Sequence, residues 1–277
     1  TGISNLWENG GFFPNGIKGL ILSLQMVMFA YLGIEMIGVT AGEVKNPEKT
    51  LARAIDSVFW RILIFYVGAL FVIMSIYPWD EIGSKGSPFV MAFEQIGIPG
   101  AAGIINFVIL TAALSSCNSG LFSTGRMLFN LAEHGQAPKN FGKLTKNGVP
   151  GTAVLATSVV LLVGVLLNYI VPAKVFTWVT SIATFGAIWT WGIILLSQIS
   201  FRKGLKPQEK EKLKYKVPLF PFTSYLALAF LAFVIIVMAF NPDTRIALVV
   251  GPLWLIFLTF YYYGKGYHKK TSKHTVN

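Results

Sequence analysis

The chain has 277 residues, of which 54% are hydrophobic and 13% are charged, and its formal net charge is +11. A soluble domain carries about 25% charged residues, so this composition excludes an ordinary soluble domain and predicts a polytopic membrane protein. The basic residues lie in short segments between apolar runs, a pattern that sets membrane orientation, and we therefore expect no nucleic-acid partner. Cys117 is the only cysteine, so neither an intramolecular disulfide nor a thiolate metal cage can form.

Seven apolar runs are long enough to cross about 30 Å of hydrocarbon as helices, which predicts an all-α membrane helix bundle. The expected spans are 17–42, 57–77, 104–132, 152–171, 175–200, 219–240 and 245–263. No low-complexity linker separates them, so we expect a single transmembrane domain over 1–277 that contacts membrane lipids. Residues 43–56 are predicted to form a charged loop that closes with a short amphipathic helix after Pro47. The apolar segment 88–98 is too short to span.

The connections between these spans alternate in charge. The basic ones are 43–56, 133–150, 201–218 and the tail after 263, and the poorly basic ones are 1–16, 78–103, 171–174 and 241–244. Because basic loops remain in the cytoplasm, this pattern predicts a multi-pass protein with Thr1 outside and Asn277 in the cytoplasm. The chain starts without Met in a loop rich in Gly, Asn and Pro, and we expect that earlier helices precede it.

The first span has an unusual interior, Tyr31-Leu32-Gly33-Ile34-Glu35. Glycine weakens a helix, and a carboxylate in hydrocarbon is costly and therefore functional or paired. The pattern predicts a broken transmembrane helix whose freed backbone groups face a cavity, as in the substrate sites of secondary transporters. The alternative is a kinked helix whose Glu35 only pairs with a neighbouring helix.

Two further spans carry polar residues in their interiors. In the third span, Ser115, Asn118 and Ser119 share one helical face beside Gly120, and they form either a second wall of the site or an ordinary helix contact. In the fifth span, hydroxyl side chains gather on one face, followed by two tryptophans; these residues are Thr177, Thr180, Ser181, Thr184, Trp189 and Trp191. A gate and a packing seam would both give this pattern.

Catalytic and cofactor-binding patterns are absent from the predicted spans. The three histidines, His134, His268 and His274, fall in cytoplasmic segments, and no span offers a metal-ligand set or a serine–histidine pair. No glycine-rich phosphate loop opens a helix, which argues against an ATP-driven motor. We therefore expect no enzyme, no metal and no cofactor, with energy supplied by an ion gradient or by exchange.

Several stretches together resemble the bacterial amino acid permeases of the amino acid–polyamine–organocation superfamily. They are Gly33–Glu43 with Lys45–Thr50, Arg61–Gly68, Ser87–Val90, Asn118–Leu128, Ala137–Lys139 and Asp243–Arg245. The similarity runs from about Gly16 to Trp254. Among subgroups, the chain is most similar to permeases for D-serine, D-alanine and glycine, with proline-type permeases next.

The resemblance implies a twelve-helix transporter of the bacterial cytoplasmic membrane, built on a five-helix inverted repeat. The seven spans would be its sixth to twelfth helices, and the N-terminal helices needed for a complete site would be missing. It also implies that broken helices hold the carboxylate and ammonium groups of the amino acid substrate. Phe29–Glu35 would be the broken segment of the sixth helix, with Phe29 as an aromatic gate.

Carried over residue by residue, the resemblance implies two walls of a substrate site. The expected substrate-binding residues are Phe29, Ala30, Tyr31, Gly33 and Ile34 in the sixth helix, and Ser119 and Gly120 in the eighth. We expect proton-coupled uptake of small neutral amino acids by alternating access.

Glu35 is the expected proton-coupling or gating residue, because burial raises a carboxyl pKa and access to water lowers it. Sodium coupling through Ser115, Ser116 and Ser119 is a variant. A membrane-embedded amino acid-binding or sensor protein without net transport is the alternative function.

Overall fold

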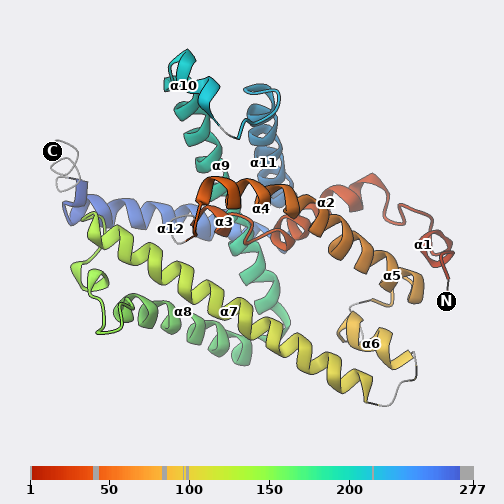
Figure 1. Ribbon diagram of the computed structural model, residues 1–277. Helices are drawn as coiled ribbons and strands as arrows, with labels where there is room; N and C mark the ends of the chain where they lie inside the picture. Colours follow the sequence, from red (N-terminus) through yellow and green to blue (C-terminus); the bar gives the residue numbers. More distant parts are fainter. Residues whose placement is uncertain are drawn as a thin grey trace. The chain divides into compact units, whose positions relative to one another are not determined.

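The computed structural model describes residues 2–39, 44–82, 86–95, 97, 100–213 and 215–268, and within them every regular element is a helix (Figure 1). The elements are α1 (Asn5–Glu8), α2 (Gly16–Ala30), α3 (Met36–Val39), α4 (Pro47–Arg61), the π-helical η2 (Ile62–Val67), α5 (Gly68–Ile76), α6 (Pro88–Gln95), α7 (Ala101–Glu133), the 3-10 helix η3 (Lys139–Gly142), α8 (Gly151–Ile170), α9 (Pro172–Gly204), α10 (Pro207–Lys212), α11 (Phe222–Phe240) and α12 (Arg245–Gly264).

Six helical segments of the described chain are long and apolar enough to cross a membrane. They are Lys49–Ile76, Ala101–Glu133, Gly151–Ile170, Lys174–Gly204, Phe222–Phe240 and Arg245–Gly264. Large apolar side chains such as Leu162 and Phe257 stay exposed on these helices, as lipid-facing side chains do. Six of the seven predicted spans therefore have membrane-length helices. The segment predicted at 17–42 contains only the shorter apolar helix α2 and then α3, and its residues 40–42 lie outside the described residues.

The short amphipathic helix expected after Pro47 is present as α4, but it is not separate from the second predicted span. It starts at Pro47 and continues through η2 into α5 without a break, so the predicted span 57–77 begins too late. Proline is tolerated in the first turn of a helix, and the residues that follow it combine charged and apolar side chains on different faces, which suits a helix at a membrane surface. The fifth predicted span, 175–200, is also too short, since α9 covers Pro172–Gly204.

Contacts divide the chain into two compact units. The first unit comprises the described residues of Thr1–Ile21 and Thr40–Gly120, and the second those of Leu22–Val39 and Leu121–Asn277. In the first unit, the amide N–H of Gly2 and the side-chain amide of Asn5 both donate to the Ser75 carbonyl, at 2.8 and 3.1 Å. The Tyr77 hydroxyl donates to the Met91 carbonyl at 3.0 Å and so fixes the short helix α6 beside the end of α5.

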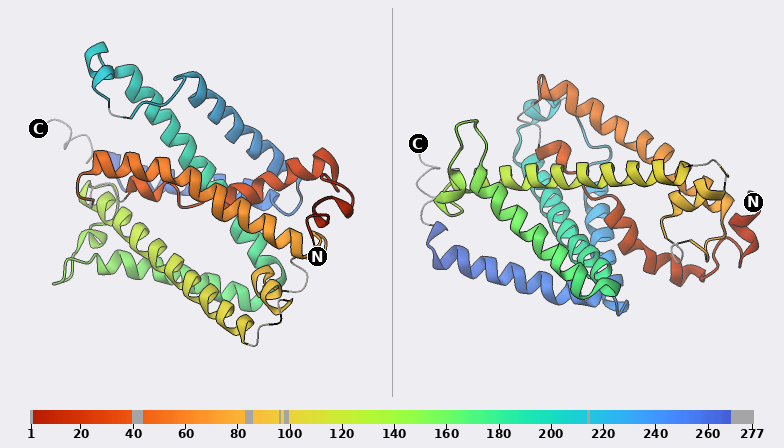
Figure 2. Two further views of the ribbon diagram at one scale, coloured as in Figure 1. Left: turned by 45° about the vertical axis from the view of Figure 1, so that its right-hand side comes forward. Right: turned by 90° about the horizontal axis from the view of Figure 1, so that it is seen from below.

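The core of the second unit lies where α9 meets the end of α2, α11 and α12. Its buried side chains are Met28, Phe185, Ile188, Leu231, Val234, Met238 and Ala247. Figures 1 and 2 show α11 running beside α9, and the tight turn at 241–244 then sends α12 back against the first half of α9. The buried Thr244 hydroxyl donates to the Met238 carbonyl at 2.8 Å, which fastens this turn to the end of α11.

Gly251 allows α12 to approach α9 closely. A Cβ added at this glycine would overlap the Phe185 ring, which is itself buried in the core. Any larger residue therefore forces the ring or the helix to shift, and overpacking of a dense core costs about 1–3 kcal/mol.

We predict that Gly251→Ala lowers the thermal unfolding midpoint of the full-length protein in detergent. Gly192→Ala is the matched control, because a Cβ at Gly192 in α9 meets no atom within 4 Å. Adding Phe185→Leu to Gly251→Ala should recover part of the loss. Equal midpoints for the two alanine variants would contradict this packing.

Candidate functional site

The helix break predicted from the sequence is present at Tyr31–Glu35. Helix α2 ends at Ala30, these five residues form turns, and α3 begins at Met36. Gly33 has a φ of +103°, a conformation that favours glycine because a Cβ would strain the backbone. The Gly33 N–H donates to both carboxylate oxygens of Glu35, at 3.3 and 3.2 Å. The break therefore uses the Glu35 side chain as the acceptor for its own backbone.

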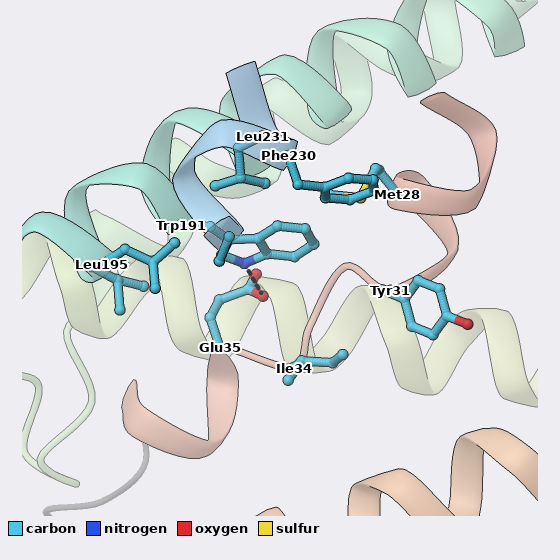
Figure 3. A pocket seen from close by; sticks show the side chains of 10 residues that line it. Met28, Tyr31, Ile34, Glu35, Trp191, Leu195, Phe230 and Leu231 are labelled. Carbon is cyan, nitrogen blue, oxygen red and sulfur yellow. Dashed lines mark hydrogen bonds between the residues drawn. The ribbon is translucent and has the colours of Figure 1, made fainter. Parts of the chain in front are cut away.

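A second donor reaches Glu35 from α9. The indole Nε1 of Trp191 donates to Glu35 Oε2 at 3.1 Å, although the two residues are 156 positions apart (Figure 3). The carboxylate is thus held between a backbone N–H of the break and a side-chain N–H of a membrane-length helix.

Trp191 owes its position to the hydroxyl-rich face of α9. Thr180, Ser181 and Thr184 are buried, and Ile188 and Trp191 continue the same face at helical spacing. Each hydroxyl donates back along its own helix; the Thr184 hydroxyl, for example, reaches the Thr180 carbonyl at 2.8 Å. These hydroxyl groups are therefore satisfied inside a packing seam. The Gln25 side-chain amide donates to Ser181 Oγ at 3.5 Å and ties α2 to that seam.

A cavity of about 460 Å³ opens beside Glu35. Its walls come from the end of α2, the break, α9 and α11, and its lining residues are Met28, Tyr31, Ile34, Glu35, Trp191, Ile194, Leu195, Ala227, Phe230 and Leu231. Figure 3 shows the Glu35 carboxylate directed at Trp191, whereas the Tyr31 hydroxyl points away from it. An apolar cavity with a few polar groups is the usual form of a small-molecule site, and this volume falls in the usual range.

The predicted site residues are not all part of this cavity. Tyr31, Ile34 and Glu35 line it, and Gly33 forms the turn that holds Glu35. Phe29 and Ala30 end α2 and are not among the lining residues, although the Phe29 carbonyl accepts the Leu32 N–H at 3.1 Å.

Ser119 and Gly120 are the predicted second wall, and they lie in α7 within the first unit. The Ser119 hydroxyl donates to the Ser115 carbonyl at 3.0 Å, one turn earlier in the same helix. Their part in a substrate site stays a prediction.

Sequence reasoning missed the α9 and α11 walls. It noted Trp191 only as a neighbour of the hydroxyl residues, and it gave Leu195, Phe230 and Leu231 no role. The available signal was the spacing from Thr184 through Ile188 and Trp191, which continues one helical face toward the far end of α9.

Comparison with known proteins gives a consistent result. The profile of the family described as "Amino acid permease" matches residues 1–276. A Bacillus subtilis (strain 168) protein named uncharacterized amino acid permease YtnA is 77% identical over 98% of this chain and 59% of its own length. The probable threonine/serine transporter YbxG of the same organism is 53% identical over 98% of this chain and 58% of its own length. The D-serine/D-alanine/glycine transporter of Escherichia coli (strain K12) is 46% identical over 92% of this chain and 54% of its own length.

The Trp191 hydrogen bond should contribute measurably to stability. We predict that Trp191→Phe, which keeps an aromatic ring but removes the N–H, destabilises the full-length protein by about 1–3 kcal/mol, the usual cost of removing one partner of a hydrogen bond and leaving the other unsatisfied. Trp189→Phe is the matched control, because the Trp189 side chain is 47% exposed and lies two residues away on another face. Thermal unfolding in detergent measures both. A Trp189 variant as unstable as the Trp191 variant would contradict this role.

Gly33 should tolerate no side chain. We predict that Gly33→Ala destabilises the break by about 1–3 kcal/mol, the usual cost of a strained backbone conformation. Gly38→Ala in α3 is the control, since Gly38 does not have a positive φ and a Cβ there meets no atom within 4 Å. The measurement is again the unfolding midpoint. An unchanged midpoint for Gly33→Ala would contradict the prediction, because it would show that this turn accepts a side chain at Gly33 without backbone strain.

Proposed function

Because the chain belongs to the amino acid permease family, we propose that it forms part of a secondary active transporter that carries amino acids across the bacterial cytoplasmic membrane. The family consists of transporters rather than enzymes, as the names of the relatives indicate. The observation that carries the proposal is the broken helix with Glu35 at its centre, beside a cavity of about 460 Å³. The chain spans between 54% and 59% of the length of the three relatives described above, so the proposal concerns the full-length permease.

We infer that α2 and α3 together make a seventh crossing, interrupted at Tyr31–Glu35. The seven crossings then correspond to the sixth to twelfth helices of an inverted-repeat transporter, and the two compact units belong to one transmembrane domain. The alternation of basic and poorly basic connections supports an orientation with Thr1 outside and Asn277 in the cytoplasm.

The broken helix provides the chemistry that a zwitterion needs. Interrupted helix ends present N–H groups to a carboxylate and C=O groups to an ammonium group. We propose that Tyr31, Gly33 and Ile34 line the substrate site, with Phe29 and Ala30 at the end of α2. Ser119 and Gly120 are proposed as further substrate-binding residues. The small residues in this set favour small neutral amino acids.

Glu35 is the proposed coupling group. As a carboxylate it accepts hydrogen bonds from Gly33 and Trp191, and protonation removes the charge that strengthens both bonds. Proton binding would therefore loosen the contact between the break and α9 while the substrate moves. The alternative of a binding or sensor protein without transport is not favoured, because the relatives are named as permeases and transporters.

Uptake of radiolabelled serine, alanine and glycine by proteoliposomes that contain the full-length permease tests the function. We expect uptake that is driven by an inside-alkaline pH gradient and abolished by a protonophore. Uptake that survives the loss of every ion gradient, without counter-substrate, would contradict secondary active transport. Saturable binding without any uptake would favour the binding protein instead.

The coupling role of Glu35 is tested separately. We predict that Glu35→Gln reduces uptake at least about tenfold and flattens its dependence on pH, because the amide cannot exchange a proton. Glu133→Gln, at the exposed end of α7, should leave both unchanged. If Glu35→Gln keeps the wild-type pH profile, Glu35 is a structural acceptor only.

A further inference from the structure

A second polar cluster lies where α9 ends and α11 begins. We name it the Gln198–Arg202 cluster; it consists of Gln198 and Arg202 of α9, Phe220 just before α11, and Ser224 in the first turn of α11. Gln198 and Arg202 are four residues apart and so share one face of α9. Both residues are partly buried, and neither has a role in the proposed transport site.

The cluster contains more donors than acceptors. The Ser224 hydroxyl donates to Gln198 Oε1 at 3.0 Å, and the Arg202 guanidinium lies over the Phe220 ring, 4.6 Å from its centroid. Gln198 Nε2 and the Nε and Nη1 atoms of Arg202 are buried, and none has a hydrogen-bond acceptor among the residues that the structure describes. The Phe220 ring attracts the guanidinium cation that lies over it, but the ring offers no conventional hydrogen-bond acceptor to the guanidinium N–H groups.

Buried donors without acceptors are costly, and those of a charged group are the most costly. Three such donors on one helical face match an acceptor with several anionic oxygens, and a guanidinium pairs well with the two oxygens of a phosphate. The missing acceptor is therefore an oxyanion that the described residues do not supply.

The surroundings favour a lipid as the source of that oxyanion. Lys203, the next residue of α9, already has a partner, because its ammonium group donates to the Tyr225 hydroxyl at 3.1 Å. Large apolar side chains stay exposed on the same stretch of chain: Leu219 by 77%, Phe222 by 64% and Leu226 by 58%. Acyl chains would cover these side chains, which free phosphate could not do.

We propose that the Gln198–Arg202 cluster binds the phosphodiester headgroup of an anionic phospholipid. Arg202 and Gln198 donate to the phosphate oxygens, Phe220 holds the guanidinium plane, and the acyl chains lie against the exposed start of α11. Basic pockets between transmembrane helices are known to take such headgroups. The site is independent of the transported substrate.

The test measures the unfolding midpoint of the purified full-length permease in a non-ionic detergent against the concentration of phosphatidylglycerol. A lipid that binds only the folded protein raises this midpoint with concentration. We expect Arg202→Gln to raise the half-effective concentration at least about tenfold, the usual value of a charge-assisted hydrogen bond. Gln198→Met should raise it several-fold. Lys203→Gln removes one positive charge from the neighbouring residue. It should change the half-effective concentration of phosphatidylglycerol less than about twofold.

Several outcomes would overturn the proposal. Equal effects of Arg202→Gln and Lys203→Gln would mean that general surface charge attracts the lipid. An equal midpoint shift with phosphatidylcholine would exclude recognition of an anionic headgroup, and an equal shift with inorganic phosphate would exclude the lipid as the source. If phosphatidylglycerol does not change the unfolding midpoint of the wild type, but Arg202→Gln lowers that midpoint, the acceptor of Arg202 lies within the protein itself. If Arg202→Gln does not fold, Gln198→Met decides between these outcomes, and an unchanged half-effective concentration in it overturns the site.

Discussion

The carboxylate of Glu35 joins the two parts of the candidate site. It accepts the Gly33 N–H from inside the helix break and the Trp191 N–H from α9, at 3.2 and 3.1 Å to the same oxygen. A backbone break inside a membrane helix is stable only where its polar groups find partners, and a carboxylate in that position needs donors for the same reason. The break supplies a donor to the carboxylate and the carboxylate supplies an acceptor to the break, so the conformation of the break depends on the Glu35 side chain and on the position of α9.

Helix α9 can serve this purpose because it is the most thoroughly packed membrane-length helix of the second unit. Its hydroxyl-rich half is held by α12, where Gly251 admits the Phe185 ring, and its other half is held by α11. The Glu35 cavity and the Gln198–Arg202 cluster both lie along the contact between α9 and α11. The contact between α9 and α11 thus borders two polar clusters, one beside a helix break and one at a helix end.

Local features of this fold could be predicted from the sequence, and distant pairings could not. The break at Tyr31–Glu35 was predictable because a glycine and a carboxylate inside an apolar run are unfavourable in any continuous membrane helix. The turn at 241–244 was predictable because Asn241 and Pro242 disfavour the continuation of a helix. Trp191 was missed as a partner of Glu35, because the spacing of residues along one helix gives no information about a contact between residues 156 positions apart. A helix after Pro47 was predicted, but its continuation into the second span was missed. The charged residues after Pro47 suggest a separate surface segment, although they also suit the exposed face of one continuous helix.

The most direct test concerns the claim that the helix break at Tyr31–Glu35 lines the substrate site, and it measures whether a transported amino acid protects the break from a thiol reagent. In a full-length permease whose native cysteines, Cys117 among them, are all replaced by serine, Ile34→Cys places a single thiol beside Glu35, and Val250→Cys places one in α12 as a control. Alkylation rates are then measured in the full-length permease with and without a transported amino acid. If the break lines the substrate site, the amino acid slows alkylation at position 34 and leaves position 250 unchanged. Equal rates at position 34 with and without substrate would contradict the account.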